Sequence, residues 1–442
     1  DVVPADNKQN NWVTNPFEMK GINGYLYGRG VSDNKGPILA ALYGVVDLIH
    51  HKELESDIIF LIEGEEESGS RGFKDAVRKQ RDLIGNIDYI IIANSYWIND
   101  DFPCLTYGLR GVLHATVIVE NDHGDVHSGV DGSFMNNEPL FDLTATLAKL
   151  KDKKNKVMIP GFYDSILPLT KVEDTRFDEI VGILIQSNTG IESLASLKAS
   201  LMARWREPNL TIHRYQVSGP NGSLVSSHAS AAISLRLVPN QEVEDIIESL
   251  ASFLQSAFAE LNSRNHLTVR IENQADAWLG DPDNAVFKTL EEAVIDVWGL
   301  SGETSGSNTP LPYPKKSANQ LSLNENIGLK IEPANLFNVT CSSDHKPPSV
   351  KLLDTSGIKN TSSYEETSSS SKFDCSNRSY MKGRRPLYIR EGGSIPSIRF
   401  LEKEFNAPAA HLPCGQASDS AHLENERFRV DNFYKSREIF RK

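Results

Sequence analysis

Apolar positions in the first hundred residues alternate between the helical and the strand period. Residues 32–51 place apolar side chains three or four positions apart, at Ile38, Leu42, Val45 and Ile49. That spacing predicts a helix that begins near Pro37. Continuous apolar runs over residues 57–64 and 88–94 predict two strands that are buried on both faces. A strand, a helix and a strand in this order predict an α/β fold with a parallel sheet covered by helices.

The pattern changes near residue 107 and changes back near residue 278. Between these positions, alternating strand-like segments are interleaved with amphipathic helical segments, which is typical of an α+β module. We therefore predict one domain in two parts, 1–106 and 279–442, with a second domain, 107–278, inserted between them. Residues 301–385 are rich in Ser, Thr, Asn, Pro and Lys. Such a segment buries too little apolar surface to offset its ordering entropy, so we predict a disordered insertion there.

A net charge of −13 over 442 residues argues against some classes of partner. Nucleic acids and anionic membranes bind basic patches, so we expect neither as a partner. No apolar run approaches the roughly 20 residues that cross a bilayer. The four cysteines show no paired spacing, which favours a reducing, cytoplasmic environment. Residue 1 is Asp and no signal-peptide pattern follows, so we expect a fragment of a longer protein.

Acidic and amide side chains gather around the ends of the predicted strands. The first strand runs into four glutamates within five positions, at Glu63, Glu65, Glu66 and Glu67. Asp33 lies in a Gly-rich loop before the first helix, and Asn94 ends the second strand. Ligands collect at the rim where the carboxyl ends of parallel strands meet, and carboxylates that converge there repel one another unless a cation lies among them. With His422 they form a mixed nitrogen and oxygen set that suits zinc or manganese.

Each of these features also has a simpler explanation. An acidic run at the end of a strand is commonly a solvated turn. Asp33 alone fits the N-cap of the helix that follows it, and His422 alone fits a structural or exposed histidine. The residues by themselves predict an α/β protein with a candidate metal site and leave both interpretations open.

Eight motifs follow one another in a single order over nearly the whole chain: DVVPAD, GRGVSDNKGP, EGEEESGS, YGLRGV, HSGVDG, SLRLVPN, REGGSIP and DSAHLENE. The series resembles the carnosinase and cytosolic nonspecific dipeptidase branch of the dinuclear metallo-exopeptidases, which are related to acetylornithine deacetylase. The resemblance implies a zinc-exopeptidase-like catalytic domain with a mixed, largely parallel sheet. It also implies that the inserted domain is a ferredoxin-like α+β lid that serves dimerisation.

The resemblance further implies how the acidic residues act. Asp33 would bridge two metal ions, and Glu67 and His422 would ligate the second of them. Glu66 would be the general base that takes a proton from the attacking water and passes it to the leaving amine. Asp1 matches the aspartate that orients a metal-bound histidine two residues earlier. The bond after Asp33 matches a position where the family has a cis peptide.

Substrate contacts are implied in the same way. In a homodimer, His127 would reach the active site of the second copy and stabilise the oxyanion. Arg236 would hold the substrate carboxylate, and Ser394 and Ser223 would line the substrate site. Simpler explanations exist here too. His127 fits a hydrogen-bonded loop histidine, Arg236 fits the exposed face of a strand, and Ser394 fits a Gly-Ser turn.

The sequence departs from the family pattern at Asn94, where the family has an aspartate that ligates the first metal. An amide oxygen is a weaker ligand than a carboxylate. The histidine expected before Asp1 also lies outside this chain. The family pattern has two metal sites, and we expect one of them, formed by Asp33, Glu67 and His422, to be well held here.

Three functions remain open from the sequence. The first is metal-dependent hydrolysis of small peptides, including dipeptides and γ-glutamyl peptides such as glutathione. The second is a non-catalytic scaffold that docks a partner, and the third is an N-acyl amino acid deacylase. The details NSYW, AWLGDPDN and LPCGQASDSAHLENE resemble the branch found in fungal glutathione-degrading complexes. That branch implies a cytoplasmic complex with a glutamine-amidotransferase-like subunit and a dipeptidase.

Overall fold

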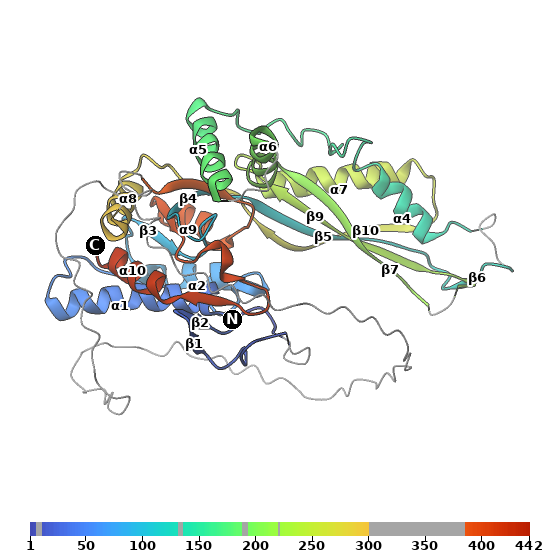
Figure 1. Ribbon diagram of the computed structural model, residues 1–442. Coiled ribbons are helices and arrows are strands. Elements are labelled where there is room, and N and C mark those ends of the chain that lie inside the picture. Colours follow the sequence, from blue (N-terminus) through green and yellow to red (C-terminus); the bar gives the residue numbers. More distant parts are fainter. Residues whose placement is uncertain (6–10, 131–135, 188–192, 220–221, 300–384) are drawn as a thin grey trace, which may run out of the picture. The chain divides into compact units, whose positions relative to one another are not determined.

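The computed structural model describes most of the chain (Figure 1). The described residues are 1–5, 11–130, 136–187, 193–219, 222–299 and 385–442. The predicted disordered insertion, 301–385, lies outside them except for Arg385. Within the described part of the chain, no helix is long and apolar enough to cross a membrane.

A mixed sheet unites strands from the two ends of the chain. Its strands are β3 (Ile90–Ala93), β4 (Cys104–Leu109), β11 (Trp278–Leu279), β12 (Leu387–Glu391) and β13 (Ala409–Leu412). β13 pairs with β3, and β12 pairs with β4, in parallel. β11 and β13 pair with β4 antiparallel. This mixed sheet, with helices packed around it, confirms the predicted α/β fold.

The predicted helix after Pro37 is confirmed, but the first predicted strand is wrong. Helix α1 spans Gly36–His51, with the proline in its first turn. Residues 57–64 form no strand, and the side chains of Ile58–Ile62 are 38% to 61% exposed. A strand forms only where a neighbour completes its hydrogen bonds. Among the described residues, β3 pairs with β13 alone and nothing pairs with the 57–64 run.

A second, four-stranded sheet lies in the inserted segment. Its order is β10-β5-β9-β7, with bounds His266–Ala275, Gly111–Glu120, His228–Leu237 and Asn209–Val217. All three pairings are antiparallel. Helices α4 (Pro139–Ala148) and α7 (Val243–Ala259) pack on one face of this sheet, where Leu113, Leu147 and Leu250 are buried together. This arrangement confirms the predicted α+β module.

Helices α5 (Lys171–Ser187) and α6 (Leu194–Trp205) belong to the same inserted segment but pack against β12. Phe177 and Leu201 share a buried cluster with Leu387 of that strand. A buried ion-pair network adds to this contact, because Glu173 bonds Arg206 Nε at 3.1 Å and Arg390 Nη2 at 2.7 Å. The inserted segment is therefore fastened to the first sheet, while the domain limits at residues 107 and 278 remain predictions.

The described residues also form two small antiparallel sheets. The first contains β1 (Lys20–Ile22), β2 (Tyr25–Tyr27) and β14 (Arg427–Arg429). The second pairs β6 (Val126–His127) with β8 (Leu224–Val225). The pairing of β2 with β14 holds residues 25–27 beside residues 427–429. It thereby brings the loops that carry Asp33 and His422 to one place.

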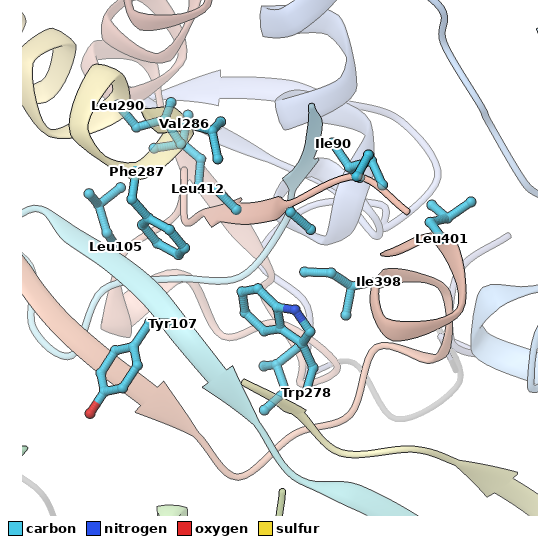
Figure 2. Packing of buried hydrophobic residues seen from close by; sticks show 14 of the residues in the cluster. Ile90, Leu105, Tyr107, Trp278, Val286, Phe287, Leu290, Ile398, Leu401 and Leu412 are labelled. Atoms are coloured by element: carbon cyan, nitrogen blue, oxygen red, sulfur yellow. The ribbon is translucent and has the colours of Figure 1, made fainter. Parts of the chain in front are cut away.

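Aromatic and aliphatic side chains fill the core around the first sheet (Figure 2). The helices that contribute to this core are α2 (Phe73–Lys79), α3 (Arg81–Ile84), α8 (Ala285–Trp298), α9 (Pro396–Phe405) and α10 (Val430–Arg441). Helix α1 packs against α10 and β3. Phe287 of α8 lies in this cluster with Leu105 and Leu412, and Trp278 lies with Ile398. Phe287 and Trp278 are both fully buried.

Replacing Phe287 with Ala should lower the free energy of unfolding by about 3–5 kcal/mol, since the truncation leaves a cavity in a filled core. Urea denaturation followed by tryptophan fluorescence measures the change. Leu83→Ala is the matched control, because Leu83 is 83% exposed and should change stability by less than about 0.5 kcal/mol. Equal losses in the two variants would contradict the assignment of this core.

Candidate metal centre and substrate contacts

Three side chains distant in sequence meet in a small cluster. Asp33, Glu67 and His422 each offer one atom to a group whose ligand atoms all lie within 4.8 Å of one another. His422 Nε2 lies 2.9 Å from Asp33 Oδ2 and 3.2 Å from Glu67 Oε1. The three residues predicted to hold one metal are therefore neighbours in the fold.

Each member of the cluster lies in a turn, not in a long helix or strand. Asp33 lies in an irregular turn, Val31–Lys35, immediately before α1, and the predicted cis bond between Asp33 and Asn34 is confirmed. Glu67 lies in a short 3₁₀ helix, Glu66–Ser68. His422 precedes β14 and has a left-handed φ of 66°. Functional side chains commonly lie on such turns, which the helices and strands around them hold in position.

The electrostatics of the cluster favour a positive charge at its centre. Hydrogen bonds to Asp33 and then Glu67 raise the pKa of His422 to about 10. The imidazolium proton therefore opposes the repulsion between the two carboxylates. Two carboxylate oxygens and one imidazole nitrogen are also a donor set that fits a divalent cation, which would take the place of this proton. The residues thus fit the predicted metal.

Glu66 and Asp1 lie next to the cluster. Burial, followed by the charges of Glu67 and Asp33, raises the pKa of Glu66 to about 7. Asp1 accepts hydrogen bonds from the backbone N–H of Glu67 at 3.3 Å and from Ser68 Oγ at 3.2 Å. Asp1 therefore contacts the turn that carries Glu66 and Glu67.

Asn94 lies near the cluster, but its side chain is engaged elsewhere. Its amide oxygen accepts a hydrogen bond from the backbone N–H of Ser95. Its backbone oxygen lies 2.9 Å from His411 Nε2, and Asn34 Nδ2 donates to the preceding carbonyl, that of Ala93, at 2.7 Å. The end of β3 thus lies beside the Asp33 turn, while the amide oxygen of Asn94 accepts the backbone N–H of the next residue, Ser95.

Arg236 and Ser394 meet where the inserted sheet approaches the loop after β12. Arg236 Nη1 donates to Ser394 Oγ at 3.2 Å, and this hydroxyl donates to the backbone oxygen of Arg110 at 2.5 Å. Burial lowers the pKa of Arg236. Within the described ranges, no carboxylate lies within ion-pair distance of this guanidinium, so its charge is available to an anion.

His127 and Ser223 lie together on β6 and the turn before β8. The backbone N–H of Ser128 donates to Ser223 O at 2.8 Å, and that of Gly129 donates to His127 Nδ1 at 3.1 Å. Both side chains are exposed. Neither belongs to the cluster of Asp33, Glu67 and His422.

A cavity of about 520 Å³ opens beside His422. Trp12 and Arg29 line it together with Leu423 and Asn425. The guanidinium of Arg29 stacks over the Trp12 ring, 5.1 Å from its centroid. Neither Trp12 nor Arg29 was predicted to be near the site, although Arg29 lies in the GRGVSDNKGP motif. Only the fold shows that this part of the motif faces His422.

Comparison with known proteins identifies the family. Residues 1–314 match the model of peptidase family M20/M25/M40. The chain therefore belongs to this family, which confirms the resemblance drawn from the eight motifs.

The most similar relatives include fungal and animal peptidases. The chain is 33% identical over 445 residues to a probable di- and tripeptidase, DUG2, of Saccharomyces cerevisiae, covering all of this chain and 40% of that protein. It is 29% identical to a Cys-Gly metallodipeptidase, DUG1, of Candida albicans over 98% of this chain and 74% of that protein. The chain thus spans less than half the length of the first of these relatives.

Solved structures agree with the fold. A yeast dipeptidase, Dug1p of Saccharomyces cerevisiae, superimposes with a TM-score of 0.67 at 26% identity, covering 99% of this chain and 76% of that one. Human carnosine dipeptidase 1 superimposes with a TM-score of 0.65 at 25% identity, covering 100% of this chain and 77% of that one. These likenesses confirm a zinc-peptidase-like fold with an inserted lid domain.

Replacing Ser394 with Ala should lower the free energy of unfolding by about 1 kcal/mol, because Arg236 Nη1 and the backbone oxygen of Arg110 both lose a hydrogen-bond partner. Chemical denaturation measures the loss. Ser252→Ala, at an exposed position on α7, is the control and should leave stability unchanged. Stability that does not fall in the Ser394 variant would show that this hydroxyl does not join the two sheets.

Proposed function

We propose that this chain hydrolyses small peptides with a bound divalent metal. The observation that carries the proposal is the convergence of Asp33, Glu67 and His422, with the carboxylate of Glu66 beside them. Membership of a peptidase family supports the same reaction class. The names of the relatives, which include di- and tripeptidases and Cys-Gly metallodipeptidases, favour very short peptides as substrates.

Asp33, Glu67 and His422 hold the metal in this proposal. Their mixed oxygen and nitrogen donors suit zinc or manganese. A bound ion of this kind lowers the pKa of water and polarises a carbonyl oxygen. Glu66 takes the proton of the attacking water and later passes it to the leaving amine. Asp1 steadies the turn of Glu66 and Glu67 through its two hydrogen bonds.

Substrate binding is assigned to the residues of the inserted segment and the loop after β12. Arg236 pairs with the terminal carboxylate of the peptide, and Ser394 fixes the orientation of the guanidinium through the 3.2 Å hydrogen bond. His127, with Ser223 beside it, completes the site of a second copy in a homodimer. His127 there stabilises the oxyanion. A lone chain would then hold only part of the substrate site.

The likeness to fungal relatives supports a proposal for the cellular role. We assign the chain to cytoplasmic breakdown of glutathione or other γ-glutamyl peptides, in a complex with a glutamine-amidotransferase-like subunit and a dipeptidase. The motif resemblance described above supports this assignment. Purification of the full-length protein with its partners is the direct test of the complex.

A non-catalytic scaffold is the second candidate function, and Asn94 is the observation that favours it. Asn94 stands where the family pattern has a metal-binding aspartate, and its neutral amide oxygen, which accepts the backbone N–H of Ser95, is a weaker ligand than a carboxylate. A chain with one well-held metal could keep the fold and dock a catalytic partner. Metal content and the Glu66 variant described below separate the two functions.

The protein should bind one tightly held Mn²⁺ or Zn²⁺ per chain, and Glu67→Gln should weaken this binding by more than about tenfold, since an amide replaces a charged ligand. Elemental mass spectrometry after gel filtration measures the stoichiometry, and chelator competition measures the affinity. Glu65→Gln is the matched control, because Glu65 lies in the same acidic run and its side chain is 55% exposed. Equal metal affinities in the Glu67→Gln and Glu65→Gln variants would show that Glu67 is not a metal ligand.

Glu66→Gln should lower kcat for dipeptide hydrolysis by about 10²–10⁴-fold, because the general base is lost. Metal content should stay unchanged, since the three ligands remain. Steady-state kinetics on the full complex, paired with metal analysis, measures both. Complex activity that survives this substitution would show that the partner performs the hydrolysis, and the scaffold function would then hold.

A further inference from the structure

A buried carboxylate outside the cluster, that of Glu426, holds the turn that carries Asp33. Its side chain is 1% exposed. Oε1 accepts hydrogen bonds from the backbone N–H groups of Ser32 and Asp33, each at 3.0 Å. Oε2 accepts from the backbone N–H of Gly30 at 2.9 Å. Three N–H groups of one turn thus converge on one carboxylate.

Arg29 extends this contact to the other side of the cluster. Arg29 Nη1 pairs with Glu426 Oε2 at 2.7 Å, and the guanidinium side chain is 3% exposed. Arg29 Nη2 donates to the backbone oxygen of His422 at 3.4 Å. Glu426 therefore contacts the backbone of one cluster residue, Asp33, and Arg29 contacts the backbone of another, His422.

The local backbone shows why these contacts are needed. Gly30 has a φ of 82°, which lies in the left-handed region that favours glycine, and Asp33 and Asn34 depart from helical angles within the turn. No regular helix or strand fixes the carboxylate of Asp33. The buried carboxylate of Glu426, which accepts three N–H bonds, supplies this constraint instead. The charge of Arg29 balances it, so the pair adds no net charge beside the metal.

We propose that Glu426, together with Arg29, is a positioning residue that sets the metal ligands Asp33 and His422 before the metal binds. This inference rests on the proposed function, since it requires that the cluster holds a metal. Groups of this kind, which hold the ligands of a metal, contribute about 10- to 100-fold to metal affinity. Neither residue touches the metal or the substrate in this proposal.

The test is the affinity for Mn²⁺ alone, measured by electron paramagnetic resonance or chelator competition. Glu426→Gln should raise the Kd by about 10- to 100-fold, because an amide accepts fewer of the three N–H bonds and leaves Arg29 unbalanced. It should also change the visible spectrum of the Co²⁺-loaded site, which reports ligand geometry. Glu260→Gln is the matched control, since that side chain is 69% exposed at the end of α7 and should leave both readouts unchanged.

A folded Glu426→Gln protein that binds Mn²⁺ as tightly as the wild type would overturn the inference alone. A wild-type protein that binds no Mn²⁺ would instead overturn the proposed function, and the inference with it. Should Glu426→Gln not fold, the double variant Arg29→Gln/Glu426→Gln removes both buried charges and takes the same measurements, with the same expected loss of affinity.

Amide hydrogen exchange on the metal-free wild-type protein gives an independent result. The amides of Gly30, Ser32 and Asp33 should exchange at least about 100-fold more slowly than in the unfolded chain, because Glu426 bonds them without the metal. Rapid exchange of these three amides before metal is added would show that the turn is not set in advance, and the proposal would fail.

Discussion

Repulsion between the carboxylates of Asp33 and Glu67 is the constraint on which the rest of the site depends. The fold places both within hydrogen-bond distance of one imidazole nitrogen, that of His422. A proton on that imidazole opposes the repulsion, which is why the pKa of His422 rises to about 10. A divalent cation at the same place carries a larger positive charge. It therefore offsets the repulsion between the carboxylates more strongly than the imidazolium proton does. The site therefore has a physical reason to bind metal, beyond its likeness to other metal sites.

Such a cluster persists only if its turns cannot move apart. Contacts between residues near the two ends of the chain prevent that movement. β2 and β14 pair directly, so the turn after β2 and the loop before β14 are fixed to each other. The buried pair of Arg29 and Glu426 then joins these two segments by hydrogen bonds. Glu426 accepts from the backbone N–H of Asp33, and Arg29 donates to the backbone oxygen of His422. Removing one partner of a buried pair leaves an unbalanced charge, which makes the contact hard to lose.

The proposed hydrolysis needs a substrate site as well as a metal, and the candidate contacts for a substrate come partly from the inserted segment. Arg236 on β9 reaches Ser394 in the loop after β12, so a guanidinium from one sheet meets a hydroxyl beside the other. Helices α5 and α6 fasten the insertion to β12 through the buried Glu173 network. Asn94 marks the difference from the family pattern, because its amide oxygen accepts the backbone N–H of Ser95 and carries no negative charge.

The sequence determined the elements with strong local signals and the chemistry of the ligands. The apolar spacing after Pro37 predicted α1, the run before Asn94 predicted β3, and the motifs pointed to Asp33, Glu67 and His422, which the fold brings together. The strand predicted over residues 57–64 is absent from the fold. An apolar run in the sequence does not show whether a neighbouring strand is present to pair with it. Only the tertiary structure gave the roles of Arg29 and Glu426. Their contacts join residues nearly 400 positions apart, and no local pattern in the sequence records such a pairing.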